Sequence, residues 1–389
     1  MISSNAFARR DEIISLPPAV LKPPQKWPSR PPSRAASSSL KQTGNPCESF
    51  RIEIMKIIAT VALKPEHRAA ISKAVPNAEI VDRRCQTQED VSALAGEGCD
   101  VMLTFRIPDD IQQRSPALKW IQLLSAGADH VMSGPLKNGA IAITTSSGIH
   151  ATAIAEYTLA SMLTYAHRIH LAIRSQLRHE WLRSGQFMSS VENLRGRTLG
   201  VIGYGSIGRE TARLAQAFGM TVLALKRNPG DRKDRGWCPA GLGDPDGTIP
   251  SKFFGPEQRE EILRESDHLS VTLPLTDHTR KFIGARELTA LKPGAFLVNI
   301  GRGEVIDETA MAAALKDGKL AGAGLDVFEH EPLAAESPLW DAENVILTPH
   351  MSGANRGYMD QACELFADNL RRFAANQSLL NLVDPKWGY

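Results

Sequence analysis

The sequence has few cysteines and no cysteine motif. Its 389 residues include five of them, far apart and without a C-x-x-C pair: Cys47, Cys85, Cys99, Cys238 and Cys363. Disulfide frameworks and thiolate zinc sites both need paired or closely spaced cysteines, so the spacing argues against both. We therefore predict reduced thiols, no metal site and a cytoplasmic protein.

Long apolar runs and an excess of charge are also missing. No stretch of about 18 apolar residues occurs, and no charged start leads into an apolar segment, which leaves a membrane span and a secretion signal unsupported. The 45 basic and 43 acidic residues leave a formal charge of +2, which favours neither nucleic acid nor an anionic membrane as a partner. The composition suits a globular protein that binds small molecules.

Residues 1–54 are rich in Pro and Ser and show no helical or strand periodicity, which predicts a disordered tail. The tail contains more Arg and Lys than acidic residues, so an organelle transit segment is one alternative. A plain extension, or an upstream start with Met55 as the true first residue, are the others. The sequence leaves these alternatives open.

From Met55 onward, apolar runs alternate with helical patterns in two series. Both series have the spacing of doubly wound parallel sheets, which predicts two α/β domains. The expected strands are 56–63, 78–81, 100–104, 120–124 and 141–144 in the first series, and 198–202, 221–225, 269–273, 295–299 and 322–326 in the second. Between the two series, small and apolar residues recur at helical spacing from Ala151 to about Ile173 without Gly or Pro, which predicts one long helix.

A glycine motif opens the second series. The strand that ends at Ile202 leads directly into a turn and a helix with apolar periodicity; the turn is formed by Gly203, Tyr204, Gly205, Ser206, Ile207 and Gly208. In a dinucleotide-binding fold the first Gly permits the tight turn, the second lets a pyrophosphate approach, and the third lets helix and strand pack closely. The helix N-terminus suits the phosphates. We predict a dinucleotide site at these six residues; an ordinary glycine turn is the alternative.

The next strand carries a signal for the type of dinucleotide. A carboxylate near its end would bind the ribose 2′-hydroxyl of NAD. The sequence has Lys226 and Arg227 there instead, and both cations can pair with a 2′-phosphate. We predict NADP as the preferred cofactor and NAD as a possible one, although two basic residues that merely face water would look the same. The residues that follow, 229–256, form a Gly-rich and Pro-rich insertion that we expect to be a surface loop or a segment folded over the cofactor.

Further motifs follow in order. They are the segments 273–276 (LPLT), 298–303 (VNIGRG), 324–332 (GLDVFEHEP) and 347–350 (LTPH). With the glycine motif, they resemble the D-isomer-specific 2-hydroxyacid dehydrogenases, in the glyoxylate/hydroxypyruvate reductase branch, over Met55 to Tyr389. The resemblance implies hydride transfer between NAD(P)H and a small 2-keto or 2-hydroxy acid.

The resemblance also implies the architecture: a Rossmann dinucleotide-binding domain inserted into a flavodoxin-like substrate domain. We expect the substrate domain over residues 55–153 and 348–389, and the dinucleotide domain over 154–347. The family further implies a homodimer built partly through the long helix after Ala155.

Three residues match the catalytic residues of the family. His350 matches the general acid/base, which suits a side chain that exchanges protons near neutral pH. Glu331 matches its carboxylate partner, and Arg302 matches the cation that binds the substrate carboxylate and polarises the carbonyl. Glu329 and His330 lie beside Glu331, but the resemblance does not select them.

The substrate and cofactor residues implied by the resemblance are spread over both domains. Ala126 and Gly127 match a loop whose backbone N–H groups bind the substrate carboxylate, and Arg106 is a possible second cation. His150 departs from the family, which commonly has Asn at that position. The remaining expected cofactor contacts are Leu273, Pro274, Thr279, Ile300, Gly301, Asp326, His350 and Gly353.

Other functions with related sequences are weighed as alternatives. Only 39 residues follow His350, too few for the regulatory domain of a phosphoglycerate dehydrogenase. Glu331 argues against the formate dehydrogenase branch, which has Gln with its histidine. A phosphite dehydrogenase and a nucleotide-sensing corepressor scaffold both retain the three residues, so they stay open.

Overall fold

The structure is a computed structural model that describes residues 54–131, 136, 141–183, 185 and 190–389. The predicted tail, apart from Ile54, lies outside the described residues. The described chain contains a five-stranded sheet and a seven-stranded sheet, and the strands of both pair in parallel. The predicted class of two parallel-sheet α/β domains is confirmed.

The first sheet is formed by the five strands that the sequence predicts. They are β1 (Lys56–Ala59), β2 (Glu79–Asp82), β3 (Val101–Thr104), β4 (Trp120–Leu123) and β5 (Ala142–Thr144). Their order is β2-β1-β3-β4-β5, the flavodoxin-like order, and Ile57 of β1 stands in register with Val101 of β3. The central strands are apolar along their whole length because helices cover both faces.

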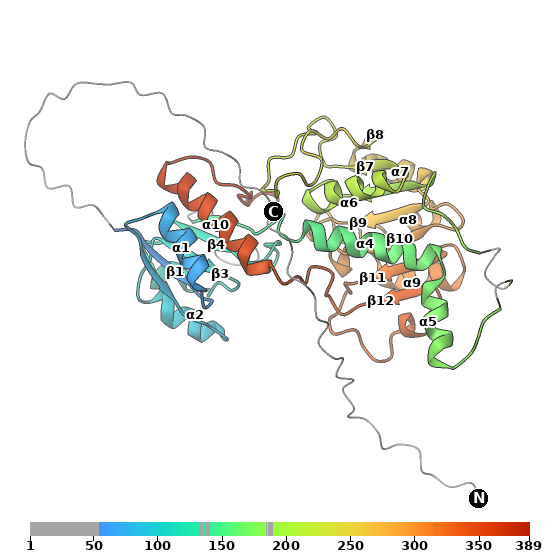
Figure 1. Ribbon diagram of the computed structural model, residues 1–389, viewed down its shortest axis with the longest axis horizontal. Helices are drawn as coiled ribbons and strands as arrows, with labels where there is room; N and C mark the ends of the chain where they lie inside the picture. The colour runs from blue at the N-terminus through green and yellow to red at the C-terminus, as the bar shows by residue number, and fades with distance from the viewer. Residues whose placement is uncertain (1–53, 132–135, 137–140, 184, 186–189) are drawn as a thin grey trace, which may run out of the picture. The chain divides into compact units, whose positions relative to one another are not determined.

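The C-terminal helix packs against this first sheet. Apolar side chains of α1 (Pro65–Ala74) and α10 (Tyr358–Ala374) form one cluster with it, and those of α2 (Gln88–Ala95) and α3 (Ile111–Arg114) form another. The fully buried Trp120 ring lies 5.3 Å from the ring of Phe366 and 5.4 Å from that of Phe373. Figure 1 shows α10 returning beside α1.

The second sheet has the Rossmann strand order with one added strand at an edge. It is formed by β6 (Thr198–Ile202), β7 (Thr221–Leu225), β8 (Lys252–Phe254), β9 (His268–Val271), β10 (Phe296–Asn299), β11 (Gly322–Leu325) and β12 (Val345–Leu347). The order is β12-β11-β10-β9-β6-β7-β8, so the direction of winding reverses between β6 and β9. Ligands of such sheets bind at the carboxyl ends of the strands at this reversal.

Helices cover both faces of the second sheet (Figure 1). On one face, α4 (Ala151–Ala166) packs against α6 (Ser206–Ala217) and the strands. The other face is covered by α7 (Arg259–Glu265), α8 (Ala285–Thr289) and α9 (Glu308–Lys316). Short 3-10 turns lie at η3 (Pro256–Gln258), η4 (Gly303–Val305) and η5 (Pro338–Asp341).

The prediction of a single long helix after Ala151 is wrong. The helix ends at Ala166, and a second helix, α5 (Ile169–Leu177), follows. Arg168 between them adopts a left-handed φ of 57°. Its Nε donates to the carbonyl of Ser190 at 2.9 Å, and its guanidinium lies 4.5 Å from the Tyr165 ring. In the described ranges, α4 and α5 included, no helix is long and apolar enough to cross a membrane.

Candidate active site

The glycine turn joins β6 to α6 at the reversal of the second sheet. Gly203 has a φ of +108°, which favours glycine, and its carbonyl accepts a hydrogen bond of 2.6 Å from Thr272 Oγ1 beyond β9. A Cβ at Gly208 would overlap the carbonyl oxygen of Gly203. The third glycine therefore has the packing role that the sequence predicts.

The second glycine faces open space. A Cβ at Gly205 would have no protein atom within 4 Å, although the residue directly precedes the first turn of α6. The N–H groups of Ser206, Ile207 and Gly208 have no partner within the helix, because the first turn of a helix has no preceding carbonyls to bind. The turn therefore fits a pyrophosphate by its open space and its free donors.

The loops after β9 and β10 lie side by side next to this turn. A Cβ at Gly301 would lie 2.6 Å from the carbonyl oxygen of Leu273, and Ile300 N donates to the carbonyl of Val271 at 3.2 Å. Thr279 Oγ1 donates to the carbonyl of Pro274 at 2.6 Å, which closes the loop after β9. These residues, predicted as cofactor contacts, meet at the carboxyl edge of the second sheet.

The two predicted 2′-phosphate ligands have different environments. Lys226 is half-buried, and its Nζ donates to the carbonyl of Asp231. Burial and the nearby Arg209 cation lower the pKa of Lys226. Arg227 is exposed, and no described carboxylate pairs with it; instead its guanidinium lies 4.3 Å from the ring of Trp387.

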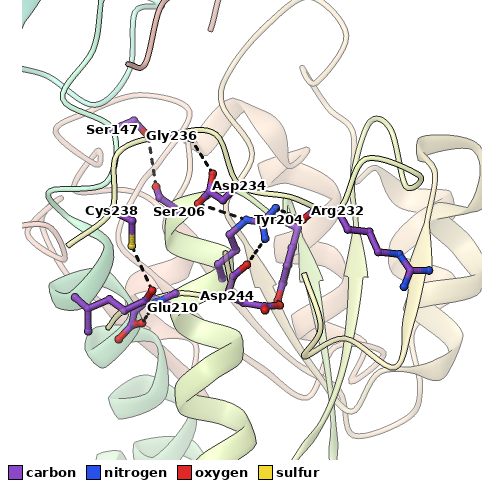
Figure 2. Close-up of polar contacts among 12 residues, drawn as sticks. Ser147, Tyr204, Ser206, Glu210, Arg232, Asp234, Gly236, Cys238 and Asp244 are labelled. Atoms are coloured by element: carbon purple, nitrogen blue, oxygen red, sulfur yellow. Dashed lines mark hydrogen bonds and ion pairs between the residues drawn. The ribbon is translucent and has the colours of Figure 1, made fainter. Parts of the chain in front are cut away.

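The insertion after Asn228 is held to the glycine turn by buried polar contacts (Figure 2). Tyr204 OH donates to the Asp244 carboxylate at 2.7 Å, and both residues are buried. Burial and that carboxylate raise the pKa of the Tyr204 hydroxyl. Asp244 also accepts hydrogen bonds from the backbone N–H groups of Thr248 (2.9 Å) and Ile249 (3.0 Å).

A buried arginine on α6 holds the same insertion. Arg209 is 1% exposed and donates to the carbonyls of Asp244 and Arg232, the second at 2.7 Å. Its Nε lies 3.6 Å from the Asp234 carboxylate. Further along the insertion, Trp237 is buried in the apolar cluster of the first sheet. The insertion is therefore a packed segment, which the expectation of a plain surface loop did not anticipate.

Asp326 organises the loop that carries His350. Its carboxylate is fully buried and accepts hydrogen bonds from Thr348 Oγ1 (2.5 Å), Met351 N (2.9 Å) and Ser352 N (2.8 Å). The carbonyl of Asp326 accepts a further bond of 2.9 Å from His350 N. In this structure Asp326 fixes the loop; its predicted contact with the nicotinamide stays a prediction.

His350 and Glu331 form a hydrogen-bonded pair. Nδ1 of His350 lies 2.7 Å from Oε2 of Glu331, and Oε1 of Glu331 accepts a bond of 3.1 Å from Phe328 N. The carboxylate requires the proton to be on Nδ1, so Nε2 is the nitrogen left for chemistry. No group in the described part of the chain hydrogen-bonds to Nε2. Glu329 is turned away and accepts from Glu308 N at 3.1 Å.

Arg302 lies against the predicted substrate loop. Its Nη2 donates to Asp129 Oδ1 at 3.0 Å, and a Cβ at Gly127 would overlap Nη2. Burial tends to raise the pKa of Asp129, but the charge and hydrogen bonds of Arg302 hold that pKa below its ordinary value. Ala126 is half-buried in the same loop. Sequence reasoning assigned no role to Asp129; its opposite charge beside the predicted carboxylate loop was the available signal.

The loops of the catalytic residues are in contact with one another. A Cβ at Gly303, the residue after Arg302, would overlap the backbone of Phe328, three residues before Glu331. The two loops therefore pack backbone to backbone, which brings Arg302 and the Glu331 pair to one region.

His150 connects the His350 loop to the substrate loop. Its Nδ1 donates to the carbonyl of Gly353 at 3.0 Å, and its ring lies 5.1 Å from that of Tyr358. Tyr358 OH donates to the carbonyl of Leu124, just before the substrate loop. Burial lowers the pKa of His150, and the Gly353 carbonyl partly opposes this effect. A neutral hydrogen-bonding role, like that of the Asn common in the family, fits these contacts.

Arg106 is exposed after β3, and its Nη1 donates to the carbonyl of Gln86 at 2.8 Å. No contact among the described residues joins it to Arg302 or His350. Its role as a second substrate cation stays a prediction. No metal cluster of His, Cys, Asp and Glu occurs among the residues that the structure describes.

Comparison with known proteins decides the family. Residues 159–352 match the family described as D-isomer specific 2-hydroxyacid dehydrogenase, NAD binding domain. A glyoxylate reductase from Aeropyrum pernix is 38% identical over 290 residues, which are 73% of this chain and 81% of that protein. The chain belongs to the D-isomer-specific 2-hydroxyacid dehydrogenase family. The predicted family and enzyme class, an NAD(P)-dependent dehydrogenase, are confirmed.

Two further relatives agree with this family. A glyoxylate reductase from Thermococcus gammatolerans is 36% identical over 301 residues, 76% of this chain and 84% of that protein. The solved structure of a D-isomer specific 2-hydroxyacid dehydrogenase from Xanthobacter autotrophicus, in complex with NADPH and MES, superposes with a TM-score of 0.69. It is 28% identical and covers 86% of this chain and 100% of its own. These dehydrogenases share the fold that positions the site.

Proposed function

We propose that this 2-hydroxyacid dehydrogenase reduces a small 2-keto acid of the glyoxylate or hydroxypyruvate type to the D-2-hydroxy acid with NADPH. The observation that carries the proposal is the 2.7 Å pair of His350 and Glu331, which leaves Nε2 of His350 without a protein partner among the described residues. The glyoxylate reductases among the relatives support the substrate class.

The residues of the chain divide the work of the reaction. The bound nicotinamide supplies the hydride. His350 donates the proton from Nε2 to the substrate oxygen, where negative charge develops. Glu331 holds Nδ1 protonated and stabilises the charged ring before the transfer. Arg302, beside Gly127, binds the substrate carboxylate and polarises the carbonyl, because a guanidinium offers two parallel donors to a carboxylate.

Asp129 sets the state of Arg302 in the absence of substrate. The ion pair of 3.0 Å occupies Nη2, while Nη1 donates to the carbonyl of Gly301 at 2.9 Å. A substrate carboxylate then competes with Asp129 for the guanidinium. The pair therefore holds Arg302 in place until substrate arrives, and Arg106 is proposed to contribute a second cation.

The preference for NADP rests on Arg227. The residue follows β7 at the place where a carboxylate would select NAD, and it carries a free positive charge. Lys226 is bonded to a backbone carbonyl and contributes mainly to the local potential. The relative solved with NADPH supports this assignment.

We also propose a homodimer, cytoplasmic location, and domain limits of 55–153 with 348–389 and of 154–347. Helix α5 presents an exposed apolar row at i, i+4 and i+8: Ile169, Ile173 and Leu177. Leu177 is 78% exposed, and Trp181 just beyond the helix is 94% exposed. Burial of such a row against a second copy would remove it from water. Light scattering that gives a monomer at micromolar concentration would contradict the dimer.

The functional test compares initial rates of NADPH and NADH oxidation with glyoxylate, hydroxypyruvate, pyruvate and 2-ketoisocaproate. We expect turnover of a small 2-keto acid and a kcat/KM that favours NADPH. A preference for NADH of about tenfold would contradict the cofactor assignment. Binding of the dinucleotide without turnover of any of the four acids would contradict the reductase, and reduction of NADP by phosphite would identify the alternative enzyme.

A further inference from the structure

Two aromatic residues near the end of the chain flank Arg227. The Arg227 guanidinium carbon lies 4.3 Å from the centre of the Trp387 ring and 5.1 Å from that of Tyr389. The ring of His278 lies 5.6 Å from the other component of this cluster, the Trp387 ring. We call Arg227, Trp387 and Tyr389 the arginine clamp.

The segment that carries the two rings is fixed to the first sheet and folded on itself. Val383 is buried, and its N–H donates to the carbonyl of Ile143 at 2.8 Å. The N–H groups of Trp387 and Gly388 both donate to the carbonyl of Asp384, at 3.0 and 2.8 Å. Because this turn is closed, the rings are presented to Arg227 from a defined support.

The contacts leave the donors of Arg227 free. An aromatic ring contacts a guanidinium through its flat face, whereas a phosphate is bound through the N–H groups at its edge. The nearby acid Asp231 is neutralised by Arg235, whose Nη2 lies 3.3 Å from it. Among the described residues, no carboxylate pairs with Arg227, so its charge remains available.

We propose that Trp387 and Tyr389 are positioning residues that hold the guanidinium of Arg227 for the 2′-phosphate of NADP. This inference rests on the proposed preference for NADP. A free arginine loses rotamer entropy when it binds a phosphate, and a guanidinium already held between rings loses less. The segment after α10 is therefore a determinant of cofactor specificity, although the residues that bind the rest of the dinucleotide lie on the second sheet.

The test measures binding of two nucleotides to the full-length protein by calorimetry, without any turnover. Adenosine 2′,5′-bisphosphate and adenosine 5′-phosphate differ only in the 2′-phosphate. We expect Arg227→Ala to weaken the first ligand about tenfold or more and Trp387→Ala to weaken it about two- to tenfold, both with little effect on the second. Trp387→Phe retains a ring and should restore binding. Trp340→Ala removes an exposed Trp on η5, away from the clamp, and is the matched control.

The outcomes separate the clamp from the proposed function. If Arg227→Ala weakens the bisphosphate and Trp387→Ala does not, the clamp is overturned and the preference for NADP stands. If Arg227→Ala leaves bisphosphate binding unchanged, the cofactor assignment fails, and the clamp fails with it. If Trp387→Ala weakens both nucleotides equally, the ring has a general structural role and the clamp is overturned. Circular dichroism and thermal unfolding check that each variant is folded.

Discussion

Glu331 holds His350 through one carboxylate oxygen while the loop holds Glu331 through the other. Oε2 lies 2.7 Å from Nδ1 of His350, and Oε1 accepts from Phe328 N at 3.1 Å. The position of the imidazole is therefore set by a carboxylate that is itself fixed by backbone. The charge of Glu331, as well as its position, should matter for catalysis.

Replacement of Glu331 by Gln tests that charge. The amide oxygen can still accept from Nδ1, but it carries no charge to stabilise the protonated ring. We expect kcat to fall about tenfold to a hundredfold with the fold intact. The matched control is Glu329→Gln, because Glu329 binds the backbone of Glu308 instead of the histidine. An equal loss in both variants would contradict the assignment.

Two glycines of the turn should respond in opposite ways to a methyl group. A methyl at Gly208 overlaps the Gly203 carbonyl, so Gly208→Ala should lower the free energy of unfolding by about 1–3 kcal/mol. A methyl at Gly205 meets no protein atom within 4 Å, so Gly205→Ala should leave stability unchanged and weaken NADPH binding. Urea unfolding and fluorescence titration measure the two effects. Unchanged NADPH affinity in Gly205→Ala would contradict the position of the pyrophosphate.

The hydroxyl of Tyr204 should stabilise the insertion. Tyr204→Phe removes a buried donor to the Asp244 carboxylate, and we expect a loss of about 1–3 kcal/mol in the free energy of unfolding. Limited proteolysis should also cut residues 229–250 faster. Tyr165→Phe is the control, because no hydrogen bond to the Tyr165 hydroxyl occurs among the described residues. Equal stability of the two variants would show that the Asp244 contact contributes nothing.

His268 should make stability depend on pH. Burial lowers the pKa of His268 to about 4, below the value near 6.5 of an unfolded histidine. As the pH falls from about 6.5 towards 4, the unfolded chain takes up a proton that the folded chain does not, so the free energy of unfolding falls by up to about 1.4 kcal/mol per pH unit. His268→Leu should have a shallower dependence, whereas the exposed His179→Asn should follow the wild type. Urea unfolding at several pH values measures the slopes, and equal slopes for His268→Leu and wild type would refute the prediction.

The sequence predicts the long buried strands well and the short edge strands poorly. Strands such as 101–104 and 296–299 are continuous apolar runs, because parallel strands are covered on both faces. β8 (Lys252–Phe254) has three residues inside a Gly-rich and Pro-rich segment, and β12 (Val345–Leu347) also has three. Three residues are too few to show a period, so neither strand was predicted.

The site was predicted as residues rather than as contacts. The motifs indicate Arg302, Glu331 and His350, but no local pattern reveals that Asp129, 173 positions away, pairs with Arg302. The break at Arg168 has the same origin, because its left-handed backbone is held by a contact with the carbonyl of Ser190. Such pairings depend on tertiary structure.

The most direct test of the account is the rate of glyoxylate-dependent NADPH oxidation by His350→Ala compared with wild type, with NADPH affinity measured on the same samples. We predict unchanged affinity and a fall in kcat of about a hundredfold or more, because Nε2 of His350 supplies the proton. A variant that binds NADPH and keeps a kcat within about threefold of wild type would contradict the account.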